Sequence, residues 1–260
     1  VAALERPAVM GELVEAAPPA APWRWDRGAG LLVRLWGGGL AAPGRARTLD
    51  GAGAAAIETA SGDWEILQFA DADLVGPDLW RLRILLRGQA GTEFLLASPS
   101  PAGARFVLLD QALARIGDPE DIGLERRWRI GALARGPGDE ACVETVAASR
   151  GTALRPMAPA RLTAIETAEG CRLRWLRRDP RDADGWGAAL DAAAPSGTLW
   201  RVTVRKDGST RRIFETSAAE ALYAAADRAA DGVAPPWRAA VAELAPGYGP
   251  GPETEITIHG

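Results

Sequence analysis

The stretch RLRILLRGQAGTEF (residues 81–94) carries the clearest structural signal in the chain, because a strand-like run stops there at a pair of glycines. From Trp80 onward, apolar residues alternate with arginines: one predicted face carries Trp80, Leu82, Ile84 and Leu86, and the other carries Arg81 and Arg83. Period-two alternation is typical of a strand with one buried face. The stretch therefore predicts a half-buried strand that ends in a turn.

The glycines of this turn fit a structural corner better than a phosphate-binding loop. A P-loop places a Lys-Ser/Thr pair after its glycines, whereas Gly91 is followed by Thr92 and Glu93. A dinucleotide fingerprint would need a third glycine and a βαβ context, and the sequence has neither. We expect Thr92 to cap a short helical turn through its hydroxyl. Arg87 and Glu93 are then free to pair within or between chains. The predicted structural corner comprises Arg87, Gly88, Gly91, Thr92 and Glu93.

Similar short runs separated by turns predict a mostly β chain of two domains. The first, residues 1–155, is expected to be a β-sandwich or barrel-like domain with decorated loops. Its predicted strands are 31–36, 55–59, 64–72, 79–87, 104–110, 126–134 and 141–148. Pro156 and Pro159 mark a linker at about residues 151–159, because X-Pro steps favour extended backbone.

The second domain, residues 156–260, is predicted to be a fibronectin type III-like sandwich. Asp207-Gly208 joins two strand-like runs as a tight hairpin turn. About seven short strands without a Cys–Trp–Cys pattern favour the fibronectin type III kind of sandwich over the immunoglobulin kind. Residues 217–232 are alanine-rich and also fit a helix, but we favour a strand followed by a short helical turn.

Composition excludes several classes of function. The 260 residues carry a net charge of −4, which argues against general nucleic-acid binding and its basic excess. No apolar run is long enough to span a membrane, and no signal peptide opens the chain. Because the sequence starts with Val1 instead of Met, we expect a fragment or a processed product.

The residues needed for common catalytic and metal sites are scarce. His259 is the only histidine and lies one residue from the end, where chains usually fray. Cys142 and Cys171 sit in different predicted strands, and both are expected to be buried hydrophobes without a disulfide. Acidic residues near turns are expected to be solvated or bound to nearby backbone instead of acting as a glycosidase pair: they are Glu93, Asp110, Asp118, Glu120 and Asp121. We therefore predict no catalytic residues, no cofactor and no metal, and a protein that is not an enzyme.

One arginine-rich segment is the best candidate for a partner or glycan contact. Arginines recur from residue 172 to 181 beside several aspartates, and Trp186 follows in a glycine-flanked loop. Arginine is favoured at protein interfaces, and an exposed tryptophan can stack on a sugar. The candidate contact residues are Trp186, Arg177, Arg178 and Arg181. Packing of the ring remains the alternative for Trp186, because tryptophan is mostly buried.

Six short motifs occur along most of the chain in one order: LLRGQAGTE (85–93), PAGARFVLLD (101–110), RRWRIG (126–131), RPMAPARLTA (155–164), LRWLRR (173–178) and DGW (184–186). In this order they resemble the C-terminal part of the very large tail protein of gene transfer agents and related tailed phages. That family is similar to baseplate-hub and host-contact proteins and carries a glycoside-hydrolase-like (β/α)₈ domain further upstream.

The resemblance implies a structural component of a phage-like tail tip or baseplate, which takes part in assembly and host-envelope contact. It further implies a homotrimer, other tail and baseplate proteins as partners, and a host polysaccharide or receptor as a further contact. The location would be a virion-like particle made in the bacterial cytoplasm. The alternative function is a carbohydrate-binding module that recognises host glycans, through loops around Trp186 or Trp23-Arg24-Trp25.

Overall fold

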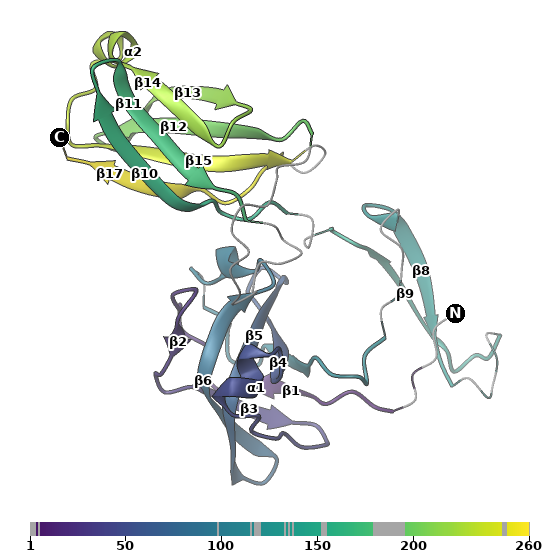
Figure 1. Cartoon of the computed structure of the whole chain (residues 1–260). Helices are drawn as coiled ribbons and strands as arrows, with labels where there is room; N and C mark the ends of the chain where they lie inside the picture. The colour runs from purple at the N-terminus through teal and green to yellow at the C-terminus, as the bar shows by residue number, and fades with distance from the viewer. Residues whose placement is uncertain are drawn as a thin grey trace. The chain divides into compact units, whose positions relative to one another are not determined.

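The computed structural model describes residues 4, 6–97, 99–114, 116, 121–132, 134, 136, 138–151, 155–178, 196–245 and 249–259. The chain divides into two compact units, Val1–Thr152 and Ala153–Gly260 (Figure 1). Both units are built from antiparallel strands, which confirms the predicted mostly β class. Arg181 and Trp186 lie outside the described residues.

The first unit contains a closed β-barrel. Its strands are β1 (Met10–Leu13), β2 (Trp25–Asp26), β3 (Leu31–Leu35), β4 (Ala54–Glu58), β5 (Trp64–Gly76), β6 (Leu79–Gln89) and β7 (Arg105–Leu108). They follow the order β2-β6-β3-β1-β7-β4-β5, and a further β5–β6 pairing closes the ring. The helix α1 (Arg45–Leu49) and the 3₁₀ turn η1 (Glu93–Leu95) decorate it. Of these seven strands, only β2 lies outside the closed ring. The sequence predicted a sandwich or a barrel-like domain, and the first unit is a barrel.

Inward-facing aliphatic side chains and two phenylalanines fill the barrel. The fully buried set is Leu13, Leu31, Val33, Leu35, Ile57, Leu67, Phe69, Leu82, Leu85 and Phe106, with alanines between them. The predicted alternation along β6 is wrong after Leu82. Ile84 adopts a left-handed conformation with φ of 54°, so Leu85 takes the core position that alternation gave to Ile84. The β5–β6 register does not shift at this point, because Arg83 pairs with Asp71 and Leu85 with Phe69, so no extra residue is inserted as it would be in a β-bulge.

A buried ion pair holds the end of β6 against β5. The Arg87 guanidinium donates to both carboxylate oxygens of Glu65, at 2.6 and 2.8 Å, and each side chain is only 2% exposed. The backbone N–H of Gly88 also donates to Glu65, at 3.2 Å. Arg87 donates further to the Pro18 carbonyl, at 3.4 Å. Of the two pairings predicted for Arg87, within or between chains, the structure has the first.

Gly88 is required at the corner for two reasons. Its φ is +65°, and an added Cβ would lie 2.7 Å from Leu96 and 2.8 Å from the backbone of Glu93. The predicted capping role of Thr92 is wrong, because its hydroxyl makes no cap hydrogen bond to η1. That hydroxyl accepts from the Ile66 N–H at 3.0 Å and donates to the Gln89 carbonyl at 2.7 Å. Because the β5–β6 register shifts between Ile66 and Gln68, Thr92 supplies a partner at that irregular point.

A separate two-stranded ribbon follows the barrel in the sequence. It pairs β8 (Glu125–Ile130) with β9 (Val143–Ala148), and these two strands form a sheet of their own. The Gly123 N–H donates to the Ser149 carbonyl at 2.8 Å, and Arg150 pairs with Asp63 of the β4–β5 turn at 3.0 Å. Cys142, predicted to lie in a strand, precedes β9 and is half-buried.

The second unit is a sandwich of two antiparallel sheets. Its elements are β10 (Ala160–Thr167), β11 (Gly170–Leu176), β12 (Leu199–Lys206), β13 (Ser209–Thr216), β14 (Glu220–Ala224), α2 (Ala225–Ala230), β15 (Trp237–Ala245), β16 (Gly249–Pro250) and β17 (Thr254–Ile258). One sheet has the order β10-β11-β14, and the other has β13-β12-β15 with β16 and β17 both paired to β15. This sandwich, with three strands in one sheet and five in the other, is of the fibronectin type III-like kind, as predicted.

Local sequence signals in this unit are confirmed. Asp207 and Gly208 both have positive φ, 52° and 75°, and join β12 to β13 as a two-residue turn. The alanine-rich segment forms β14 and then the short helix α2, as favoured from the sequence. Cys171 is buried in β11 and is free, and burial raises the pKa of its thiol to about 11.

Aromatic rings make up much of the sandwich core. Trp175, Trp200 and Trp237 are buried with Tyr223, while Trp64, Trp80 and Trp128, also predicted to be core, are only half-buried. Trp175 meets Trp200 edge-on with ring centroids 5.6 Å apart, and Tyr223 meets Trp237 at 5.4 Å. Edge-to-face geometry is favourable for aromatic pairs beyond the area that they bury.

The buried Arg87–Glu65 pair predicts a large loss of stability when one partner is removed. Glu65→Gln leaves a buried guanidinium without its counter-charge, so we expect the barrel to lose about 3–5 kcal/mol of unfolding free energy. Urea denaturation measures the loss of unfolding free energy, and hydrogen exchange of peptides from the barrel tests whether the loss occurs there.

Two variants serve as controls for that measurement. Glu58→Gln removes the exposed pair with Arg105 and should cost at most about 1 kcal/mol. The double variant Glu65→Leu/Arg87→Met removes both charges, so it should recover most of the loss. Equal effects of Glu65→Gln and Glu58→Gln would contradict a special role for the buried pair.

Candidate functional site

A groove lies at one side of the sandwich. It has a volume of about 390 Å³ and is lined by Arg172, Phe214, Thr216, Ala218, Glu220, Ala221 and Leu222. The groove lies where β13, the edge of one sheet, runs beside β14, the edge of the other. Among the described residues, no strand pairs with the outer side of either edge, so both edges can accept further backbone hydrogen bonds.

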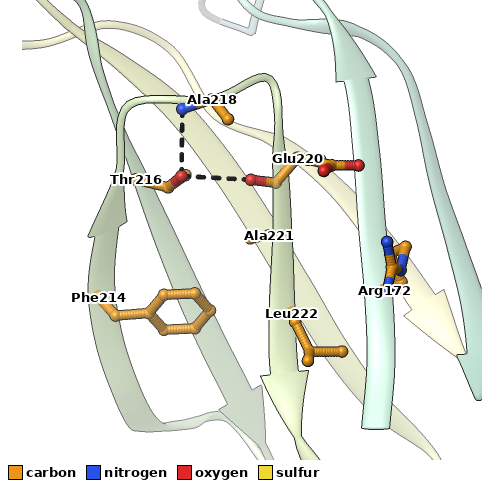
Figure 2. A pocket seen from close by; sticks show the side chains of 7 residues that line it. All are labelled: Arg172, Phe214, Thr216, Ala218, Glu220, Ala221 and Leu222. Atoms are coloured by element: carbon orange, nitrogen blue, oxygen red, sulfur yellow. Dashed lines mark hydrogen bonds between the residues drawn. The ribbon is translucent and has the colours of Figure 1, made fainter. Parts of the chain in front are cut away.

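The walls of the groove combine apolar and polar groups, and the polar share is slightly larger. Figure 2 shows the Phe214 ring extending from β13 toward β14, and Leu222 extending from β14 toward Arg172. Phe214 stacks on Tyr223 with ring centroids 6.4 Å apart. Leu222 is 39% exposed, although β11 lies directly beside it through the Arg172–Leu222 register pair. These side chains give the groove an aromatic and aliphatic lining.

A short turn closes one end of the groove. The Thr216 hydroxyl donates to the Glu220 carbonyl at 3.3 Å and accepts from the Ala218 N–H at 3.2 Å (Figure 2). The charged groups at the rim are paired: Glu220 accepts from Arg174 at 3.0 Å, and Arg172 lies 3.7 Å from Glu169. The groove therefore combines an aromatic ring and aliphatic side chains with polar groups that are already paired, which suits contact with a peptide.

A polar network beneath the groove connects the two sheets. Tyr223 of β14 donates to Asp231 at 2.7 Å, and Arg212 of β13 donates to the same carboxylate at 2.6 Å. Hydrogen bonds from Arg212 and then Tyr223 lower the pKa of Asp231 below its ordinary value. Burial first, and then the bond to Asp231, raise the pKa of Tyr223. The network therefore fixes the spacing of β13 and β14, which sets the width of the groove.

The structure places the sequence-predicted contact residues away from this groove. Arg177 follows β11 and is 9% exposed, and it donates to Glu243 of β15 at 3.0–3.2 Å. Its guanidinium therefore links the two sheets and is withdrawn from the surface, which corrects its predicted role as a contact. Arg178 is half-buried beside it. Arg181 and Trp186 fall outside the described residues.

The carboxylates considered as a catalytic pair are dispersed. Asp110 pairs with Arg6 at 3.4 Å, and Asp121 pairs with Arg126, whose pKa it raises. Glu93 begins η1 at the corner, while Asp118 and Glu120 lie outside the described residues. Within the described part of the chain, no three His, Cys, Asp or Glu side chains gather as a metal site. The same residues form no helix long and apolar enough to cross a membrane.

Sequence reasoning missed the groove because it is made by sheet order. Phe214 and Leu222 were recognisable as strand residues, but nothing local distinguishes an edge strand from a central one. Only the pairing of β13 with β12 alone, and of β14 with β11 alone, exposes these two side chains to a common space. The Asp207-Gly208 hairpin signal located β13 without showing that it lies at an edge.

Comparison with known proteins finds one family model that is similar to part of the first unit. Residues 8–107 match the family described as "Rcc01698-like, C-terminal", and this range covers the barrel strands from β1 nearly to the end of β7. The matched description is of a C-terminal domain. No curated protein matches the chain.

Among solved structures, the rat CD45 extracellular region, domains d3–d4, is similar at 10% identity with a TM-score of 0.28. The similarity covers 59% of this chain and 72% of that one. The assignment of both folds rests on the strand order and does not depend on this similarity.

The lowered pKa of Asp231 predicts acid sensitivity of the sandwich. A carboxylate whose folded-state pKa is depressed contributes stability above its ordinary value of 3.8, and that contribution is lost as pH falls through the lower folded value. We expect Asp231→Asn to lower the melting temperature at neutral pH. As pH falls below about 4, we also expect the melting temperature of Asp231→Asn to drop by less than that of the unmodified chain. Thermal unfolding across this range, with Asp207→Asn as a matched turn control, measures the difference. Parallel pH curves for the unmodified chain and Asp231→Asn would contradict the assignment.

Proposed function

We propose that this chain is a structural component of a phage-like tail tip or baseplate, of the gene-transfer-agent type, that takes part in assembly and in contact with the host envelope. The six ordered motifs from residue 85 to residue 186 carry the proposal. The family match over residues 8–107 supports its coarser part, a C-terminal domain. As part of the same proposal, the protein acts as a homotrimer with other tail proteins and is not an enzyme.

The cross-strand ion pairs of the two units agree with a structural role. Arginines join neighbouring strands through acidic residues: Arg105 pairs with Glu58, Arg174 with Glu220, and Arg201 with Glu215. Cross-strand ion pairs of this kind fix register and specificity of packing. In the described residues the ionisable groups are thus spread over sheet surfaces, as suits a protein that works by contact with neighbours.

Localisation in a particle tests the main proposal. A C-terminal epitope tag on the encoded protein should co-purify with assembled particles, and gold-labelled antibody should mark the tail tip in electron micrographs. Glu65→Gln, which weakens the barrel, should lower the yield of tailed particles, whereas Glu58→Gln should leave it unchanged. A tag recovered only in particle-free fractions would contradict the proposal.

Glycan recognition is the second candidate function, and exposed tryptophans favour it. Trp23 is 55% exposed and is held at φ of 61°, and Trp36 is 59% exposed. An exposed indole provides a flat apolar surface on which a sugar ring can stack. Trp23 belongs to the Trp23-Arg24-Trp25 segment already considered for this role.

Glycan-array binding by the isolated chain tests this candidate. We expect binding to fall at least tenfold in Trp23→Ala, while Trp64→Ala, whose ring is covered by Arg105 at 5.2 Å, serves as the control. Equal loss in both variants, or an array without any binding, would contradict glycan recognition through Trp23.

A further inference from the structure

In the described part of the chain, no third strand pairs with the β8–β9 ribbon, and one of its faces carries exposed apolar side chains. Residues directly opposite each other in antiparallel strands share a face. One face therefore carries the pairs Arg126–Ala147, Trp128–Thr145 and Ile130–Val143, and the other carries Glu125–Ala148, Arg127–Val146 and Arg129–Glu144. Ile130 and Val143 are 59% and 64% exposed. A two-stranded ribbon is marginally stable by itself, and three or more strands with an apolar face are needed for stability.

The two edges of the ribbon differ in how they are protected. The β8 sequence, ERRWRI, carries three arginines, and such charges discourage pairing with another strand. The β9 sequence, VETVAA, has one charged residue, no proline and no lysine or arginine. Since neither strand has a further partner among the described residues, β9 presents the edge that favours strand addition.

The β9 sequence is complementary to itself in one antiparallel register. When two copies are centred on Thr145, that residue faces its own copy, Glu144 faces Val146, and Val143 faces Ala147. Threonine pairs are favourable across strands, and no like charges meet. The corresponding pairing of β8 places arginine against arginine, whether it is centred on Arg127 or on Trp128. Repulsion between arginines therefore disfavours the pairing of β8 with its own copy, whereas β9 can pair with its own copy without such repulsion.

We propose that β9 pairs with β9 of a second copy of this chain, antiparallel and centred on Thr145. The product is a four-stranded β8-β9-β9-β8 sheet in which Trp128, Ile130 and Val143 of both copies share one face. This contact is twofold, so it is separate from a threefold contact in a tail hub. It does not depend on the proposed tail function, because it concerns the isolated chain.

Engineered cysteines test the register directly. In the proposed register the two Thr145 Cα atoms lie about 4.5–5.5 Å apart, within disulfide range. The two Glu144 Cα atoms are separated by two further residues along the strand, roughly 8 Å, which is too far for a disulfide. In a Cys142→Ser background, mild oxidation should therefore cross-link Thr145→Cys into a covalent dimer and leave Glu144→Cys without a covalent cross-link. The opposite result, or equal cross-linking of both variants, overturns the proposal.

Charge reversal at the same position tests the pairing without a covalent bond. Light scattering across a dilution series should give about twice the 27.3 kDa chain mass for the unmodified protein at high concentration. Thr145→Lys and Thr145→Glu should each be monomeric because like charges then face each other, and an equal mixture should dimerise again. Circular dichroism of each variant confirms an unchanged fold, since Thr145 is exposed. A monomeric unmodified chain at every concentration, or a Thr145→Lys variant that still dimerises, overturns the proposal.

Discussion

The bidentate pair between Arg87 and Glu65 is the interaction on which the barrel end depends. Taking both charges out of water is costly, and only close geometry with further hydrogen bonds offsets that cost. Here the Gly88 N–H completes the shell of Glu65, and the Pro18 carbonyl accepts from Arg87. One pair thus ties together β5, the end of β6 and the segment before β2. The glycine at position 88 belongs to the same arrangement, because a side chain there would meet Leu96 and Glu93.

The sandwich relies on a different kind of link between its layers. Its core is aromatic, and at two places polar side chains join one sheet to the other: Arg177 to Glu243, and Arg212 with Tyr223 to Asp231. The second link lies under the edge groove, so it positions Phe214 and Leu222 as well as stabilising the fold. Arg87 and Arg177 thus act as buried links inside the two units, whereas arginines such as Arg105 and Arg174 pair at exposed positions. The segment interpreted from the sequence as a contact surface contributes Arg177 to the fold, and its other contact residues stay a prediction.

The candidate contact surfaces lie at sheet edges, where the pairing between strands ends. The groove follows the two unpaired sheet edges of the sandwich, and the ribbon presents an edge and an apolar face that the rest of the described chain leaves uncovered. Both features combine backbone edges with exposed apolar side chains, and the groove adds polar groups that are paired with their neighbours. A protein organised in this way is suited to add strands or bury side chains against other chains, which agrees with the assembly role proposed for it.

The sequence by itself determined the strand-rich class, the hairpin at Asp207-Gly208, and the strand and short helix after residue 219, because turns and alternation are local properties. It did not determine that β3 pairs with β6 and β1 with β7 to complete the ring, that Ile84 adopts a left-handed conformation, or that Thr92 bonds to Ile66 instead of capping η1. Those outcomes depend on which strands become neighbours, and a neighbour 20 or more residues away leaves no local trace. The same holds for Arg87: its charge was visible in the sequence, but only the tertiary structure brought Glu65 within 2.6 Å of it and excluded water from both.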